Sequence, residues 1–171
     1  MSGTGAHQRR LANWLRLAGE PTRTLGRFIE ERFVRELVKA GFALVGVARG
    51  DSNRTVSGRE IRLERRVDSF VDVILVAFDK YRAPRFAVSF MRSRDDDHTT
   101  KIVRAAYLTK SHNEYFRMWG KPWWLPKSLW PRNAPARVAD ELVSKCPQII
   151  AFLDDDVRGP NIGRPNAAIN D

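Results

Sequence analysis

Residues 59–91, REIRLERRVDSFVDVILVAFDKYRAPRFAVSFM, decide the fold of this chain. At their start, the residues Ile61, Leu63, Arg65 and Val67 alternate with charged residues, which indicates a strand with one packed and one solvated face. Two apolar stretches, Phe70–Phe78 and Phe86–Met91, follow, and turn-forming residues separate them. Because no helix lies between these stretches, they predict an antiparallel meander rather than parallel strands.

Further strands are expected on both sides of this stretch. Residues 42–48 are apolar and precede a turn-rich loop at 49–58, so they predict a first strand and a hairpin connection. A polar loop at 93–100 leads to residues 102–108, which fit a fifth strand or a short helix, and we favour the strand.

Helices are expected before and after the strands. Residues 11–18 carry apolar side chains three and four apart, and Gly19 and Pro21 would end this short helix. A longer helix is predicted over residues 25–40, with Thr24 as its cap and Gly41 in the left-handed position at its end. Near the C-terminal end, Asn133 is the expected cap of a helix whose apolar stripe reaches Cys146, and Pro147 would break or kink it.

The fold class is therefore α+β: an antiparallel four- or five-stranded meander sheet with N- and C-terminal helices packed on one face. A chain of 171 residues is long enough for one good core. The expected organisation is a disordered leader at residues 1–9, a single domain at 10–153 and a flexible tail at 154–171.

The net charge of +10 indicates a basic surface, which suits an anionic partner but is also found in ordinary proteins. Arginine supplies most of this charge, as in proteins from GC-rich bacterial genomes. Cys146 is the only cysteine, and no secretion signal or membrane-spanning stretch is recognisable, so a cytoplasmic location without membrane insertion is expected.

The layout resembles a group of small uncharacterised bacterial domains, some of which are suspected to be toxin-immunity proteins. The likeness covers residues 25–153: the helix from Phe33 with its Gly41-Phe42 end, the strands between Arg59 and Phe90, and the Trp-containing segment before the last helix. The resemblance implies a protein that binds a partner, and it assigns no role to any single residue.

Common enzyme signatures are absent from the sequence, so no cofactor or metal is expected and the prediction leans against an enzyme. His7, His98 and His112 are far apart and lack cysteine neighbours, which excludes a structural zinc site. There is no phosphate-binding glycine loop and no Gly-x-Ser-x-Gly elbow. Cys146 lies on an apolar helical stripe, which favours a buried packing thiol over a nucleophile.

Two groups of carboxylates leave alternatives open. A metal-dependent nuclease would need acids on neighbouring strands, and Asp72 with Glu64 is the pair to consider, because Asp79 shares the strand of Asp72 and faces the other way. Asp72 is otherwise explained as a half-buried acid paired with Arg62 or Arg66. The run from Asp95 to His98 suits either a solvated turn or a divalent-ion site.

The aromatic segment from residue 111 to residue 131 is rich in glycine and proline, and regular structure is not expected there. Its rings suit a lid on the sheet, a protein interface or a platform that stacks unpaired bases. The predicted partner-binding residues are Tyr115, Arg117, Trp119, Lys121, Trp123, Trp124, Lys127 and Trp130. The predicted function is a non-enzymatic binding or immunity-like module for a macromolecular partner, a protein before a nucleic acid. The alternative is a basic protein that binds or processes nucleic acid.

Overall fold

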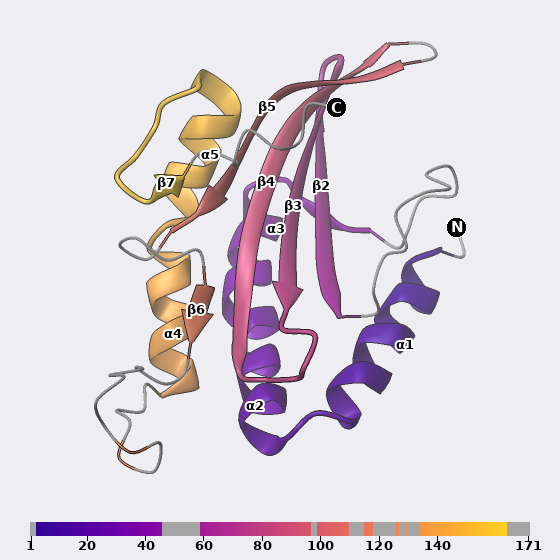
Figure 1. Cartoon of the computed structure of the whole chain (residues 1–171). Coiled ribbons are helices and arrows are strands. Elements are labelled where there is room, and N and C mark those ends of the chain that lie inside the picture. Colours follow the sequence, from indigo (N-terminus) through magenta and orange to yellow (C-terminus); the bar gives the residue numbers. More distant parts are fainter. Residues whose placement is uncertain are drawn as a thin grey trace.

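A computed structural model of the chain describes residues 3–45, 59–96, 99–109, 115–117, 126, 129 and 134–163. These residues form an α+β fold with one antiparallel sheet, as the sequence predicts (Figure 1). The strand order is β1-β2-β3-β4-β5-β7, and β6 pairs with β4 beside this path. The bounds of the strands are β1 Ala43–Leu44, β2 Glu60–Val67, β3 Phe70–Phe78, β4 Arg85–Asp96, β5 Thr99–Leu108, β6 Tyr115–Arg117 and β7 Ile162–Gly163.

The central strands follow the predicted alternation. In the register of β2 against β3, Leu63 lies opposite Ile74 and both side chains are fully buried on the face that packs against the helices. We call this the inner face of the sheet. Arg62 and Glu64 belong to the opposite, outer face, where they form an ion pair at 2.7 Å. One buried and one solvated face therefore result from the period of two along β2.

The sheet is larger than the sequence suggested. β4 continues through residues 93–96, which had been predicted as a loop, and it pairs with β5 across a register shift at Arg92 and Ser93. β6 contradicts the prediction of irregular structure for residues 111–131, because it pairs with residues 85–87 of β4. The buried Phe116 explains this strand, since its ring stacks on Phe86 with 5.4 Å between ring centroids.

The longest helix is continuous over residues 20–39. It consists of α2 Glu20–Phe28, the π-helical segment η1 Ile29–Val34 and α3 Arg35–Lys39. Its predicted start at Thr24 is wrong: Gly19 occupies the cap position, and Pro21 lies in the first turn, where a missing N–H costs nothing. The predicted end is correct, because Gly41 has φ +89° and the Phe42 N–H donates to the Leu37 carbonyl at 3.1 Å.

The remaining helices are α1 Gly3–Arg16, α4 Pro135–Val143 and α5 Cys146–Asp155. Helix α1 starts within the predicted leader, whose small polar residues gave no periodic signal. Ala134 rather than Asn133 is the N-cap of α4. The predicted break at Pro147 is present, because α4 ends at Val143 and Pro147 lies in the first turn of a new helix, α5. The predicted tail contains the end of α5 and all of β7.

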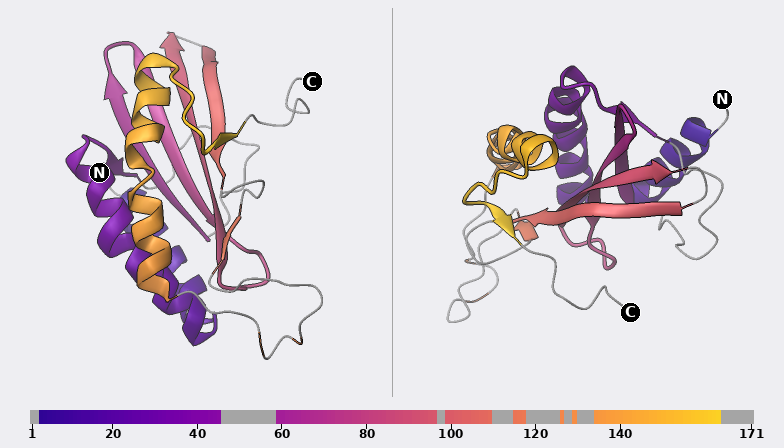
Figure 2. Two further views of the ribbon diagram at one scale, coloured as in Figure 1. Left: turned by 90° about the vertical axis from the view of Figure 1, so that its left-hand side faces the viewer. Right: turned by 90° about the horizontal axis from the view of Figure 1, so that it is seen from above.

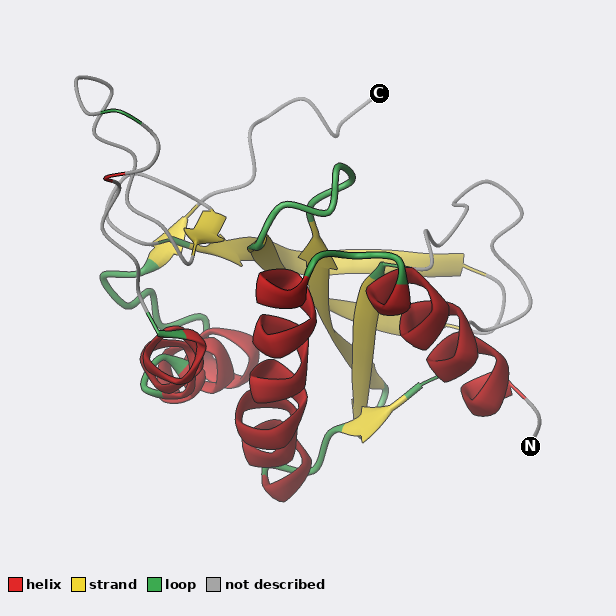
Figure 3. Cartoon of the chain, turned by 90° about the horizontal axis from the view of Figure 1, so that it is seen from below, coloured by secondary structure: helices red, strands yellow, loops and turns green. Residues whose placement is uncertain are grey.

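Helices α2–α3, α4 and α5 lie on the inner face of the sheet, whereas α1 stands to one side of them (Figures 2 and 3). Phe152 of α5 packs edge-on against Phe90 of β4 with 5.5 Å between ring centroids. The Trp14 ring of α1 lies 5.8 Å from that of Phe78, at the end of β3. Among the described helices, none is long and apolar enough to cross a membrane.

Candidate binding surface

Most of the predicted partner-binding residues lie outside the described part of the chain. These are Trp119, Lys121, Trp123, Trp124, Lys127 and Trp130. Tyr115 and Arg117 lie in β6, where the backbone is described and their side chains are not. Their role in binding therefore stays a prediction, and β6 shows only that the aromatic segment begins beside residues 85–87 of β4.

Asp72 is fully buried on the inner face, where two arginines enclose it. Its Oδ1 accepts a hydrogen bond from Arg92 Nε at 2.6 Å, and its Oδ2 accepts from Arg65 Nη2 at 2.7 Å and Arg92 Nη2 at 2.8 Å. Asp154 of α5 accepts from the same two Nη2 atoms, at 2.6 and 2.8 Å. We call Asp72, Arg65, Arg92 and Asp154 the Asp72 network. Its ion pairs connect the end of α5 to the sheet.

The Asp72 network corrects two expectations. Arg62 and Arg66 do not pair with Asp72, because both belong to the outer face, whereas Arg65 stands directly opposite Asp72 in the register. Glu64 does not join Asp72 either, since its register partner is Val73 and its side chain lies on the other face. The acid pair of a two-strand nuclease site is therefore not assembled by these residues.

The run from Asp95 to His98 is described only in part. Asp95 and Asp96 belong to the end of β4, and the side chains of residues 95–98 lie outside the described set. Within the described residues, no group of three or more His, Cys, Asp or Glu side chains has the arrangement of a metal site. The proposal of a divalent ion at residues 95–98 stays untested.

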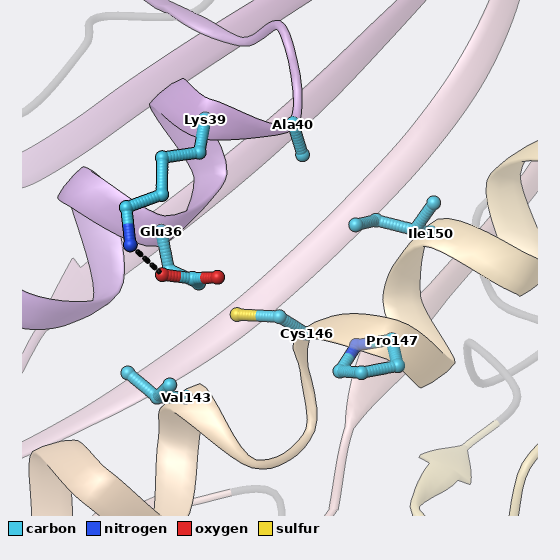
Figure 4. A pocket seen from close by; sticks show the side chains of 7 residues that line it. All are labelled: Glu36, Lys39, Ala40, Val143, Cys146, Pro147 and Ile150. Carbon is cyan, nitrogen blue, oxygen red and sulfur yellow. Dashed lines mark hydrogen bonds and ion pairs between the residues drawn. The ribbon is translucent and has the colours of Figure 1, made fainter.

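Cys146 faces a pocket of about 280 Å³ between α3 and the start of α5 (Figure 4). The pocket is lined by Glu36, Lys39, Ala40, Val143, Cys146, Pro147 and Ile150. Burial, and to a smaller extent the Glu36 carboxylate, raises the pKa of the Cys146 thiol to about 12. The thiol is protonated at neutral pH, so it is a buried packing group and a poor nucleophile, as the sequence predicted.

The loop between β3 and β4, residues 79–84, is held in one shape by buried groups; we call it the Tyr81 loop. The Asp79 Oδ1 accepts the Tyr81 N–H at 2.9 Å, and its Oδ2 accepts Arg85 Nε at 2.6 Å. The buried Thr22 of α2 donates its hydroxyl to the Arg82 carbonyl at 2.8 Å. Arg82 has φ +60°, a left-handed conformation that a non-glycine residue adopts at a cost.

The electrostatic surroundings of Asp79, the acid that holds this loop, keep its carboxyl group ionised. Burial, the largest single influence, would raise the pKa of the Asp79 carboxyl. The Arg85 guanidinium and the backbone amides of Tyr81 and Ala83 together outweigh burial and lower this pKa below its usual value of 3.8. Asp79 is therefore ionised at neutral pH, and its hydrogen bonds to the loop are maintained.

The Tyr81 loop presents an aromatic ring and cations to solvent. Tyr81 is 75% exposed, and the Lys80 ammonium lies 4.8 Å from its ring centroid. Leu17, in the link between α1 and α2, is 62% exposed at the same end of the molecule (Figure 1). Among the described residues, Arg16, Lys80 and Arg82 have no carboxylate partner, whereas the nearby acids Glu20 and Asp79 are paired with Arg23 and Arg85.

The sequence indicates residues 82–84 as turn formers but does not indicate this surface. The one local signal is Asp79 itself, since aspartate often accepts the backbone N–H two residues later in an Asx turn. No family model matches this chain, and comparisons with curated proteins and with solved structures likewise return no match.

Proposed function

We propose that this chain is a non-enzymatic module that recognises an acidic macromolecular partner, a protein before a nucleic acid, through a surface that includes the Tyr81 loop. An immunity protein, the role that the resemblance implies, is a module of this kind. With Cys146 as its one cysteine, we propose the cytoplasm as its place of action.

The observation that carries the proposal is the exposure of Tyr81 on a loop whose shape is already fixed. Tyrosine and arginine are enriched among the residues that dominate protein interfaces. A loop that is rigid before binding loses little conformational entropy on binding. Within the described part of the chain, Arg16, Lys80 and Arg82 lack carboxylate partners, so they favour acidic partners through long-range attraction, as does the net charge of +10.

The carboxylates and the thiol that a catalytic role would need are engaged elsewhere. Both carboxylate oxygens of Asp72 accept hydrogen bonds from Arg65 or Arg92, and Asp79 is bound to Arg85. The pKa of Cys146 is raised to about 12, so its thiolate is scarce. These arrangements support binding rather than catalysis.

A single-stranded nucleic acid is the second candidate partner. An aromatic ring beside a lysine and an arginine is the combination that stacks an unpaired base and neutralises the phosphates next to it. Tyr81 with Lys80 and Arg82 supplies this combination. The predicted Trp-rich contacts, among them Trp123 and Trp124, would serve either partner.

Site-specific photo-crosslinking in the producing cells tests the proposal. A photo-reactive amino acid placed at position 81 should give a discrete crosslinked protein species. The same group at Val38, which is 50% exposed on α3, is the matched control and should give none. Crosslinks to nucleic acid at position 81 would favour the second candidate. Equal yields at both positions would contradict a binding role for the Tyr81 loop.

A further inference from the structure

β5 has an open edge. One side of β5 pairs with β4, and the other side pairs with β7 only at Tyr107 and Leu108. Within the described ranges, no strand pairs with residues 99–106 on the side away from β4. Figure 1 shows this half of the β4–β5 hairpin reaching beyond the helices. An open edge offers backbone N–H and C=O groups to any strand that can pair with it.

β7 pairs with the last two residues of β5 only, in a register that the sequence after it does not favour extending. The Thr109 N–H donates to the Asn161 carbonyl at 2.7 Å, and the Asn161 side-chain amide donates to the Thr109 carbonyl at 3.1 Å, so residues 109 and 161 face each other at a hydrogen-bonding position. Such positions recur every second residue in an antiparallel ladder, so Tyr107 with Gly163 is the next. A strand that continued in this register would bring Pro165 opposite Ala105, and proline has no N–H to donate there.

The open edge carries apolar and cationic side chains. Ile102 is 49% exposed and Val103 is 47% exposed, which leaves two adjacent β-branched residues in contact with water. Lys101 lies opposite Arg94 in the register, and both are exposed. Among the described side chains no carboxylate pairs with either of them; those of Asp95 and Asp96 are not in that set. Like charges directly opposite each other repel unless an anion lies between them.

We propose that residues 99–105 of β5 bind an extended peptide segment by strand addition, and that this segment carries acidic and β-branched side chains. The backbone ladder would supply affinity, the acidic side chains would neutralise Lys101, and the apolar ones would cover Ile102 and Val103. A second copy of this chain fits less well, because it would bring another net charge of +10 to a cationic edge.

This site is independent of the Tyr81 loop. Arg94 lies nine positions after Arg85 along β4, which places the two surfaces roughly 30 Å apart. Experiments can therefore contradict the strand-addition site and still confirm binding at the Tyr81 loop, or the reverse.

Titration of the isotope-labelled full chain with two end-capped ten-residue peptides tests the inference. One alternates glutamate with valine, and the other alternates lysine with valine. The Glu-Val peptide should shift the backbone amide signals of residues 99–105 and should bind at least tenfold more tightly than the Lys-Val peptide. Lys101→Glu should reverse this preference. Arg35→Glu, a charge reversal at an exposed position on α3, is the matched control and should leave the preference unchanged.

Three outcomes would overturn the inference. The first is equal binding of both peptides, or shifts confined to residues other than those of β5. The second is self-association of the chain through β5 in sedimentation experiments, which would identify a second copy as the occupant. The third is unchanged binding when alternate peptide nitrogens of the Glu-Val peptide are methylated, because methylation removes the N–H groups that a ladder requires.

Discussion

The Asp72 network and the Tyr81 loop use the same chemistry for different ends. Each has a buried aspartate that accepts hydrogen bonds from arginine, at Asp72 on the inner face and at Asp79 beside the β3–β4 loop. In the network, two arginines and two carboxylates face one another and join α5 to the sheet. At the loop, one ion pair supports a neighbour, Tyr81, that faces solvent.

The difference separates groups that hold the fold from groups that are free to recognise a partner. The Asp72 network directs its charged groups at one another across α5 and the sheet, so its contribution is to the stability and placement of α5. The Tyr81 loop has its supporting bonds inside and its ring and cations outside. Changes in the network should therefore affect folding, and changes at the tip of the loop should affect binding alone.

The largest effect is expected from Asp72→Ala. This change removes the fully buried acid of the network and leaves Arg65 and Arg92 with Asp154 alone, and the loss of one partner from a buried ion pair costs about 3 to 5 kcal/mol. Urea unfolding monitored by tryptophan fluorescence measures this loss. A cost below about 1 kcal/mol would mean that the network is not closed as described.

A smaller loss is expected from Asp79→Ala. It removes the charged acceptor of hydrogen bonds from Arg85 and from the Tyr81 amide, and the loss of hydrogen bonds to a charged group costs roughly 1 to 3 kcal/mol. The same variant should speed hydrogen exchange at the Tyr81 amide. If stability falls while that exchange is unchanged, Asp79 supports the sheet and not the loop.

The effect of Asp79 should also depend on pH. Its folded-state pKa is lowered, so its stabilising effect is fully present above the unfolded value, near pH 4, and is lost as pH falls through the folded value. The stability difference between the wild type and Asp79→Asn should thus be larger at about pH 6 than at about pH 2. Unfolding curves at both values measure it; a constant difference would contradict the lowered pKa.

The smallest change in stability is expected from Tyr81→Ser. The ring is 75% exposed, and surface substitutions away from packed groups alter stability by about 0.5 kcal/mol or less. Thermal unfolding checks this, with Phe116→Ala as the buried aromatic control, for which about 3 to 5 kcal/mol should be lost. A loss of that size for Tyr81→Ser would place the ring in the core of the fold.

Alternation along the strands predicted the centre of the fold well. It placed Ile61 and Leu63 on the buried face. The same alternation places Arg65 on that face too, and this would have been enough to predict its pairing with Asp72. Composition predicted strand ends and helix starts less well. Residues 93–96 are polar yet lie in β4 because pairing with β5 continues there. Pro21 fits both the end of one helix and the first turn of the next.

The candidate surface was harder to predict because it depends on contacts between distant residues. The shape of the Tyr81 loop requires the Thr22 hydroxyl, which lies 60 positions away in the sequence. How much of the β5 edge is open depends on where β7 pairs with β5, and no local sequence pattern encodes that pairing. The local sequence shows how many aromatic residues a segment contains but not which of them are exposed. It therefore favoured the Trp-rich segment over the single exposed Tyr81.

The central claim is that the Tyr81 loop is a preformed recognition surface, and its most direct test is the affinity of the partner identified by crosslinking at position 81. Calorimetric titration of that partner should show at least a tenfold weaker affinity for Tyr81→Ser than for the wild type, the roughly 1.4 kcal/mol or more expected of an interface anchor. The two proteins should have the same melting temperature. Unchanged affinity for Tyr81→Ser would contradict the account.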